Sequence, residues 1–119
     1  LIIISAIIGL MPGEKQESLR IIEDRRQRRL DSQPLEYPSA GSVFRNPPNS
    51  VAGKLSDEAG CKGMRIGGAR VIEQHGNIIA TEAGATSSDV AALIVCVREA
   101  VFERHKVLLD REIVILQTD

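Results

Sequence analysis

A proline-rich stretch from Gln33 to Pro48 is the feature that most constrains how this chain can fold. Proline lacks a backbone N–H, clashes with the preceding turn of a helix, and pushes the residue before it toward an extended conformation. We therefore expect the stretch to be extended or looped, with no helix running through it. The prolines concerned are Pro34, Pro38, Pro47 and Pro48.

An apolar run and then a helix-forming sequence precede this stretch. Residues 1–8 are rich in isoleucine, which predicts a buried strand, and Met11-Pro12-Gly13 ends it. Residues 14–30 contain strong helix formers without proline or glycine, which predicts a helix. The apolar run has no basic region before it and is too short to span a bilayer, so it predicts neither a signal peptide nor a membrane segment. Because the chain opens inside this run and without Met, we expect a fragment of a longer protein.

Short elements are predicted after the prolines. Ser50 is placed to cap a helix that runs to Ala59, and Gly60 is placed to stop it. Residues 65–71 and 77–80 predict two short strands, with a tight backbone at Gly67-Gly68. Residues 112–117 alternate loosely and predict a final strand.

The clearest helix begins at Thr86, Ser87 or Ser88 and ends near His105. Its apolar residues recur at i, i+3, i+4, i+7 and i+11, so they share one face: Val90, Leu93, Ile94, Val97 and Val101. A helix with one such face needs a sheet or another helix to cover it. The sum predicts an α+β fold, with a small sheet covered by helices.

Composition excludes several classes of function. The chain has 16 acidic and 15 basic residues, so its near-neutral charge argues against binding nucleic acid by bulk charge. The few aromatic residues argue against base stacking as well. Cys61 and Cys96 have no metal-ligand spacing, which predicts free thiols in a reducing cytosol and no metal site.

The segment "PLEYPSAGSVFRNPP" carries the strongest chemical signal. Ser42 follows a flexible glycine in a loop stiffened by prolines, and loops held by rigid elements commonly carry function. Arg45 and Asn46 supply donors suited to an anionic or polar ligand. The residues alone leave open a second interpretation, a proline-rich surface turn with a capping serine.

This segment resembles the signature loop of the UDP-N-acetylenolpyruvoylglucosamine reductases, especially their shorter type II members. The resemblance continues in order through "SVAGKLSDEAGCKGMRIGGARV", "HGN" and "ATSSDVAALI". "IISAIIGL" is similar to the last strand of the preceding flavin domain. The resemblance implies that residues 1–31 are the end of an FAD-binding domain with a connecting helix. It implies that residues 32–119 are a C-terminal domain that binds a UDP-sugar.

The family activity implied is that of an NADPH- and FAD-dependent UDP-N-acetylmuramate dehydrogenase, which serves bacterial peptidoglycan synthesis in the cytoplasm. NADPH reduces FAD, and the flavin reduces the enolpyruvyl ether of UDP-N-acetylglucosamine-enolpyruvate. The resemblance makes Ser42 the proton donor, and "LDREI" makes Glu112 the second catalytic group. The alternative for Glu112 is an exposed strand residue paired with a lysine or arginine.

The resemblance also names the residues that bind the UDP-sugar: Asn46, Lys62 and His75, with Arg45 near the phosphates. For His75, a purely structural hydrogen bond is the alternative. No glycine-rich dinucleotide fingerprint is present, so FAD is expected on the missing N-terminal domains and the fragment alone is expected to be inactive. The rival interpretation is a truncated, non-catalytic remnant that at most binds a nucleotide sugar.

Some positions depart from the family pattern. Ser56 stands where an apolar residue is usual, and His105-Lys106 replaces a usual Phe-Gly before the last strand. These departures bear on packing rather than on the residues assigned to the chemistry.

Overall fold

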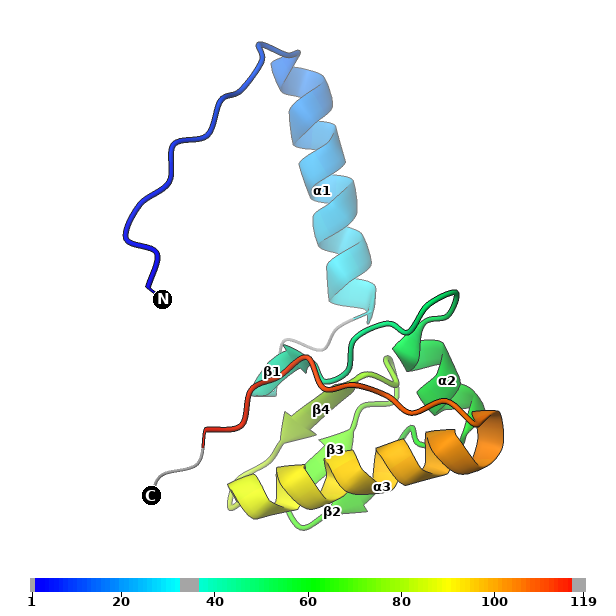
Figure 1. Cartoon of the computed structure of the whole chain (residues 1–119). Helices are drawn as coiled ribbons and strands as arrows, with labels where there is room; N and C mark the ends of the chain where they lie inside the picture. Colours follow the sequence, from blue (N-terminus) through cyan, green and yellow to red (C-terminus); the bar gives the residue numbers. More distant parts are fainter. Residues whose placement is uncertain (1, 33–36, 117–119) are drawn as a thin grey trace. The chain divides into compact units, whose positions relative to one another are not determined.

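The structure of this chain, a computed structural model, describes residues 2–32 and 37–116. Two compact units divide the chain, Leu1–Asp31 and Ser32–Asp119, and each is described by itself (Figure 1).

The first unit contains one helix, α1 (Lys15–Ser32), in the place that the sequence predicted. Its surface is largely charged and is laced by pairs four residues apart, such as Arg28 with Asp24 at 3.0 Å and Gln27 with Asp31 at 2.8 Å. Such pairs each add a few tenths of a kcal/mol to an exposed helix, about 0.2–0.5 by typical measurements.

The strand predicted for residues 1–8 is absent from the described residues 2–8, which form neither helix nor strand. Their apolar side chains are exposed, with Ile4 at 94%. A strand exists only when a neighbouring strand takes up its N–H and C=O groups, and no such neighbour is present within the described residues of this unit. The run is apolar, as the sequence shows, but an apolar run does not say which neighbouring strand would pair with it. Leu1 lies outside the described residues.

The second unit is built on a four-stranded antiparallel sheet in the order β1-β4-β3-β2. The strands are β1 (Ser39–Ser42), β2 (Arg65–Ile66), β3 (Ala69–Val71) and β4 (Ile78–Thr81). The predicted strand over residues 65–71 is a hairpin, because Gly67-Gly68 turns the chain between β2 and β3. Gly67 has φ +51°, a conformation that tight two-residue hairpin loops require and that glycine adopts without strain.

The same unit contains two helices, α2 (Ala52–Glu58) and α3 (Ser87–His105). α3 packs against α2, β2 and β3, as Figure 1 shows. Thr86 caps α3: its hydroxyl accepts the Asp89 N–H while the Asp89 carboxylate accepts the Thr86 N–H, at 3.1 and 2.9 Å. The α+β fold and the boundaries of this helix are confirmed.

The core lies between α3 and the sheet. The predicted apolar face of α3 supplies one side of it, because Leu93, Ile94, Val97 and Val101 are fully buried and Val90 is half-buried. Phe44, Val71 and Leu109 belong to the same cluster. None of the helices in the described part of the chain is both long and apolar enough to cross a bilayer.

Two predicted local features are wrong. Ser50 does not cap α2: the cap position is Val51, and the side-chain oxygen of Asn46 accepts the Ala52 N–H at 3.0 Å instead. The final strand over residues 112–117 is reduced to a single bridge between Phe44 and Arg111. Beyond Ile113 the described side chains, such as Val114 at 81%, are exposed, so nothing there sustains a longer ladder. Gln117 lies outside the described residues.

Candidate functional site

Ser42 ends β1 and lies opposite Ile78 of β4. The preceding residue, Gly41, has φ +78°, and the register shifts between Ser39 and Ser42, so the strand bends at this point. The Ser42 side chain is exposed, whereas the next two residues, Val43 and Phe44, are buried. The serine hydroxyl therefore stands at the surface on a backbone that its neighbours anchor in the core.

Asn77 fixes the main chain just after Ser42. Its side-chain oxygen accepts the Phe44 N–H and its amide donates to the Phe44 carbonyl, both at 2.8 Å. The Asn77 carbonyl also accepts the Val43 N–H at 2.9 Å. Asn77 is 4% exposed, and its two side-chain hydrogen bonds to Phe44, the Asn77 clamp, satisfy the buried oxygen and nitrogen of its amide.

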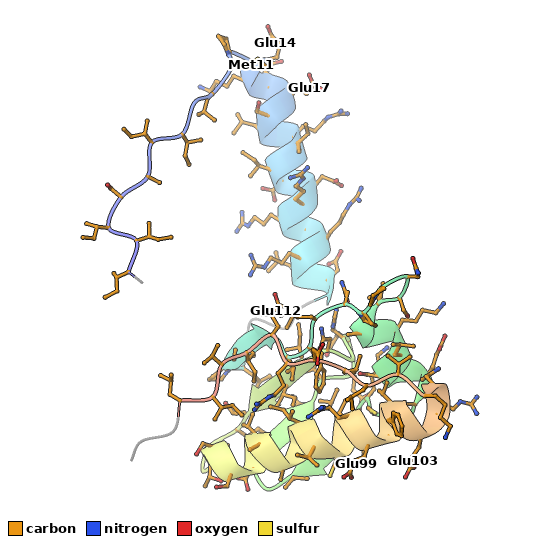
Figure 2. All side chains as sticks on the ribbon, in the orientation of Figure 1. Met11, Glu14, Glu17, Glu99, Glu103 and Glu112 are labelled. Carbon is orange, nitrogen blue, oxygen red and sulfur yellow. The ribbon has the colours of Figure 1, made fainter. Side chains whose placement is uncertain are left out.

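Glu112 lies beside Ser42 through the backbone. The Glu112 N–H donates to the carbonyl of Val43 at 2.9 Å, and the Arg45 N–H donates to the carbonyl of Asp110 at 2.9 Å. In Figure 1 the segment after α3 runs back beside β1, and Figure 2 shows Glu112 on it. Within the described part of the chain, the Glu112 carboxylate has no ion-pair partner, so the alternative role as one half of a surface pair has no support there.

Lys62 and His75 line one pocket of about 240 Å³ next to α2, together with Lys54 and Asp57. Lys62 Nζ lies 2.7 Å from Asp57 Oδ2, and its side chain is 28% exposed. His75 Nδ1 accepts the Asn77 N–H at 3.1 Å, which leaves Nε2 as the nitrogen available to a ligand. The structural hydrogen bond and a ligand contact therefore use different ring nitrogens.

Gly53 allows His75 to pack on α2. A Cβ at this position would lie 3.0 Å from His75 Cε1, closer than side chains normally approach. The glycine in "SVAGK" thus has a packing role beside the Lys62–His75 pocket.

Asn46 and Arg45 lie apart from the Lys62–His75 pocket. The Asn46 oxygen is occupied by the Ala52 N–H, so its amide nitrogen is the group free to meet a ligand. Arg45 lines a different pocket, with Arg98 and Arg111. The structure thus bonds the Glu112 backbone to Val43, the residue after Ser42, brings Lys62 and His75 to one pocket, and places Arg45 in another.

A dinucleotide cradle is not present among the described residues. Gly67-Gly68, the one glycine pair of the chain, is in the β2–β3 turn. A Cβ at Gly67 would meet Asp89 at 2.5 Å and a Cβ at Gly68 would meet Ala85 at 2.7 Å, so neighbouring side chains already fill the space. The Gly67-Gly68 turn therefore offers no room for a pyrophosphate group.

A family model for the C-terminal domain of UDP-N-acetylenolpyruvoylglucosamine reductase matches residues 33–116, which include every candidate residue above. The chain belongs to this family. A UDP-N-acetylenolpyruvoylglucosamine reductase from Carboxydothermus hydrogenoformans is 46% identical over 114 residues. One from Bacillus licheniformis is 39% identical over 115 residues, which are 97% of this chain and 62% of that relative.

A solved structure agrees with the sequence relatives. The crystal structure of the reductase from Thermus caldophilus superposes with a TM-score of 0.74 and 36% identity, over 87% of this chain and 36% of that one. The alignment to the Carboxydothermus hydrogenoformans relative covers 96% of this chain but only 38% of the relative. The chain thus spans well under half the length of that reductase.

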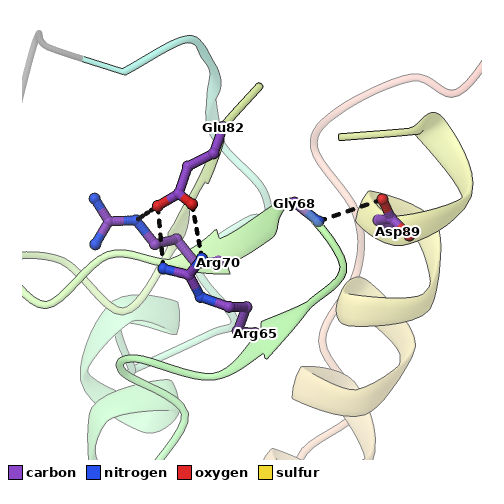
Figure 3. A network of polar contacts seen from close by, with 5 residues as sticks. All are labelled: Arg65, Gly68, Arg70, Glu82 and Asp89. Carbon is purple, nitrogen blue, oxygen red and sulfur yellow. Dashed lines mark hydrogen bonds and ion pairs between the residues drawn. The ribbon is translucent and has the colours of Figure 1, made fainter. Parts of the chain in front are cut away.

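Sequence reasoning missed a polar network around the β2–β3 hairpin of this reductase domain (Figure 3). Glu82 accepts two hydrogen bonds from Arg65, at 2.7 and 3.0 Å, and pairs with Arg70 at 3.2 Å. The bonds from Arg65 lower the pKa of the Glu82 carboxyl. The Gly68 N–H donates to Asp89 at 3.4 Å, which ties the turn to the start of α3.

This network and the Asn77 clamp share one reason for having been missed. Their partners lie 12 to 33 positions apart in the sequence, so no local pattern indicates them. For Asn77 one signal was present, a polar residue directly before the apolar residues Ile78, Ile79 and Ala80 of β4.

Proposed function

We propose that this chain is the substrate-binding, C-terminal part of a flavoenzyme that uses NADPH to reduce UDP-N-acetylglucosamine-enolpyruvate to UDP-N-acetylmuramate. The product feeds peptidoglycan synthesis in the bacterial cytoplasm. One observation carries the proposal: the family match over residues 33–116 includes both Ser42 and Glu112, and the backbone of Glu112 is hydrogen-bonded next to Ser42.

Ser42 acts as the general acid. Reduction of an enolpyruvyl ether leaves negative charge on the carbon next to the carboxylate, and that carbon must receive a proton from a nearby neutral group. The exposed Ser42 hydroxyl on a fixed backbone fits this role, since a donor must be held in place while the charge develops. Glu112, one step across the backbone ladder, is the second catalytic group.

Lys62 binds the diphosphate of the UDP-sugar, with His75 Nε2 and the Asn46 amide as further donors. The Lys62–Asp57 pair does not prevent this, because a partly exposed ion pair is worth only about 0–1 kcal/mol. Asp57 holds the ammonium group in the pocket until a phosphate competes for it. We assign Arg45 to the phosphates as well, because it lines a pocket with two other arginines, which together favour an anion.

FAD is held by another part of the full-length protein; the filled Gly67-Gly68 turn, which leaves no dinucleotide cradle among the described residues, supports this. We assign residues 1–31 to the end of that FAD-binding part: α1 is the connecting helix, and residues 1–8 become a strand only where the FAD-binding part supplies a neighbouring strand. The alignment to the Carboxydothermus hydrogenoformans relative supports this, because it covers 96% of the chain and so extends well into residues 1–31. An exposed apolar run such as residues 2–8 also needs a partner surface.

The test is substrate-dependent oxidation of NADPH by the full-length protein, encoded together with the sequence upstream of Leu1. We expect NADPH consumption that requires UDP-N-acetylglucosamine-enolpyruvate and yields UDP-N-acetylmuramate in equal amount. A full-length protein that binds the UDP-sugar but never oxidises NADPH would overturn the proposal and favour a non-catalytic remnant.

A further inference from the structure

Three arginines from distant parts of the sequence line a single pocket of the second unit. Arg45 follows β1, Arg98 is on α3 and Arg111 is on the segment after α3, and they line a pocket of about 530 Å³. Asp110 is the one acidic residue of the lining, and residues 113–115 form an apolar wall. The lining therefore carries an excess of positive charge.

Within the described residues, the guanidinium groups of these arginines have no protein partner. None of the three side chains forms an ion pair or a hydrogen bond there, and Asp110 does not neutralise any of them. Other cations of the same unit are paired, such as Lys62 with Asp57 and Arg65 with Glu82. The pocket therefore gathers three guanidinium groups that are unpaired in the described part of the chain, whereas those two cations are neutralised by carboxylates.

Arg98 gives the strongest indication of a ligand. Its Nε is shielded from solvent and has no hydrogen-bond partner. A buried N–H donor is normally satisfied, and one that is not calls for an unseen acceptor. An anion in the pocket would supply that acceptor.

The backbone holds the other two arginines in place. The Arg45 N–H is bonded to the Asp110 carbonyl at 2.9 Å, and Arg111 forms the bridge with Phe44. These bonds fix the backbone from which the two side chains extend, and guanidinium groups bind phosphate and carboxylate oxygens through paired hydrogen bonds.

We propose that the Arg45–Arg98–Arg111 pocket binds a small polyvalent anion, of the phosphate-ester or diphosphate class. The lining of this pocket shares no residue with the Lys62–His75 pocket, so it is a second anion-binding site in the domain. Two sources fit the same chemistry, an anionic group of the nucleotide-sugar substrate and a free phosphate compound. The inference does not rest on the proposed function, because it is tested by binding and needs no turnover.

The test is titration calorimetry of the 119-residue chain with inorganic pyrophosphate at low salt. We expect saturable binding at this pocket, and we expect Arg98→Gln and Arg111→Gln each to weaken it about tenfold or more, because each loses a charge-assisted contact. Arg104→Gln is the matched control: it removes the same charge from an exposed position of α3 outside the pocket. Should Arg98→Gln fail to fold, Arg45→Gln and Arg111→Gln still decide, because both side chains are exposed.

If Arg104→Gln weakens pyrophosphate binding as much as Arg98→Gln does, the anion binds through nonspecific charge attraction and the proposal is overturned. Binding that only Lys62→Gln removes would place pyrophosphate in the other pocket and overturn it as well. If the variants behave as expected, displacement of pyrophosphate by UDP-N-acetylglucosamine assigns the pocket to the substrate, and undisturbed pyrophosphate binding assigns it to a free anion.

Discussion

Ser42 presents an exposed hydroxyl on a main chain that is held from two sides. β4 pairs with it through Ile78, and the Asn77 side chain clamps Phe44 two residues later. A proton donor gains from such support, because a small misplacement of a catalytic group costs a large part of its effect. The proton transfer thus depends on the Ser42 side chain, whereas Asn77 and Ile78 hold the Ser42 backbone in position.

Ser42→Ala in the full-length enzyme should leave the reduction of the flavin by NADPH nearly unchanged. The reoxidation of the flavin by the UDP-sugar should slow about 10²–10⁴-fold, the usual cost of losing a positioned general acid. Stopped-flow absorbance resolves the two half-reactions, and Ser39→Ala on the same strand is the control. A variant that slows the NADPH step and spares the substrate step would refute the assignment.

Lys62→Ala should raise KM more than it lowers kcat. A diphosphate contact is present in the ground state and in the transition state alike, and removing such a contact weakens binding without changing bound-state chemistry. Steady-state kinetics over a wide substrate range measure the split. Lys54→Ala, in the same pocket but paired with Glu58, serves as comparison. A large loss of kcat with KM unchanged would contradict this role.

Ser56→Ala should stabilise the second unit. The Ser56 side chain is fully buried on α2, and its hydroxyl has no partner among the described residues. A buried hydroxyl without a hydrogen bond costs about 1–3 kcal/mol of desolvation, which alanine avoids. Urea unfolding should show a higher midpoint for Ser56→Ala and little change for the exposed control Ser88→Ala. A lower midpoint would mean that the hydroxyl does have a partner.

At the scale of elements, a helix or strand could be predicted from the sequence when the residues that determine it are close together in the chain. α3 was predicted almost to the residue, because its capping box and its apolar period are read from neighbouring positions. The strands predicted for residues 1–8 and 112–117 were wrong, since a strand exists only with a partner and the sequence names none. The candidate site divides in the same way: the loop that carries Ser42 is visible in the sequence, whereas its pairing with Glu112 and its clamp by Asn77 require the fold.

The start of α3 should make stability depend on pH. The backbone N–H of Thr86 donates to Asp89, and this bond, with that from Gly68, lowers the pKa of the Asp89 carboxyl. A carboxyl with a depressed folded pKa stabilises the fold above its unfolded pKa, about 3.9, and this stabilisation is lost as the pH falls through the folded pKa.

Asp89→Asn is the variant that isolates this effect. We expect the difference in unfolding free energy between the native chain and Asp89→Asn to be constant above about pH 5 and to shrink below about pH 4. Urea unfolding at a series of pH values measures the difference. A gap that widens on acidification would show that the Asp89 charge opposes folding.

At the scale of the whole molecule, the second unit has a complete core of its own. All of its buried apolar residues lie between Val43 and Leu109. Residues 2–31, by contrast, are exposed throughout. The two units therefore differ in kind: one can stabilise itself, and the other displays apolar side chains that its own unit does not cover.

Deleting residues 1–10 should accordingly improve solubility without unfolding the rest. Contiguous apolar surface of the kind displayed by Ile2, Ile4, Ile7 and Leu10 drives self-association, whereas the core of the second unit contains none of these residues. Light scattering should show a shift from oligomers toward monomers, and circular dichroism should show the same thermal midpoint for both chains. A control that replaces Ile4 and Ile7 by Ser in the intact chain should reproduce the gain in solubility. If the trimmed chain unfolds, or the intact chain is already a stable monomer, residues 1–10 pack within this domain and do not belong to the flavin-binding part.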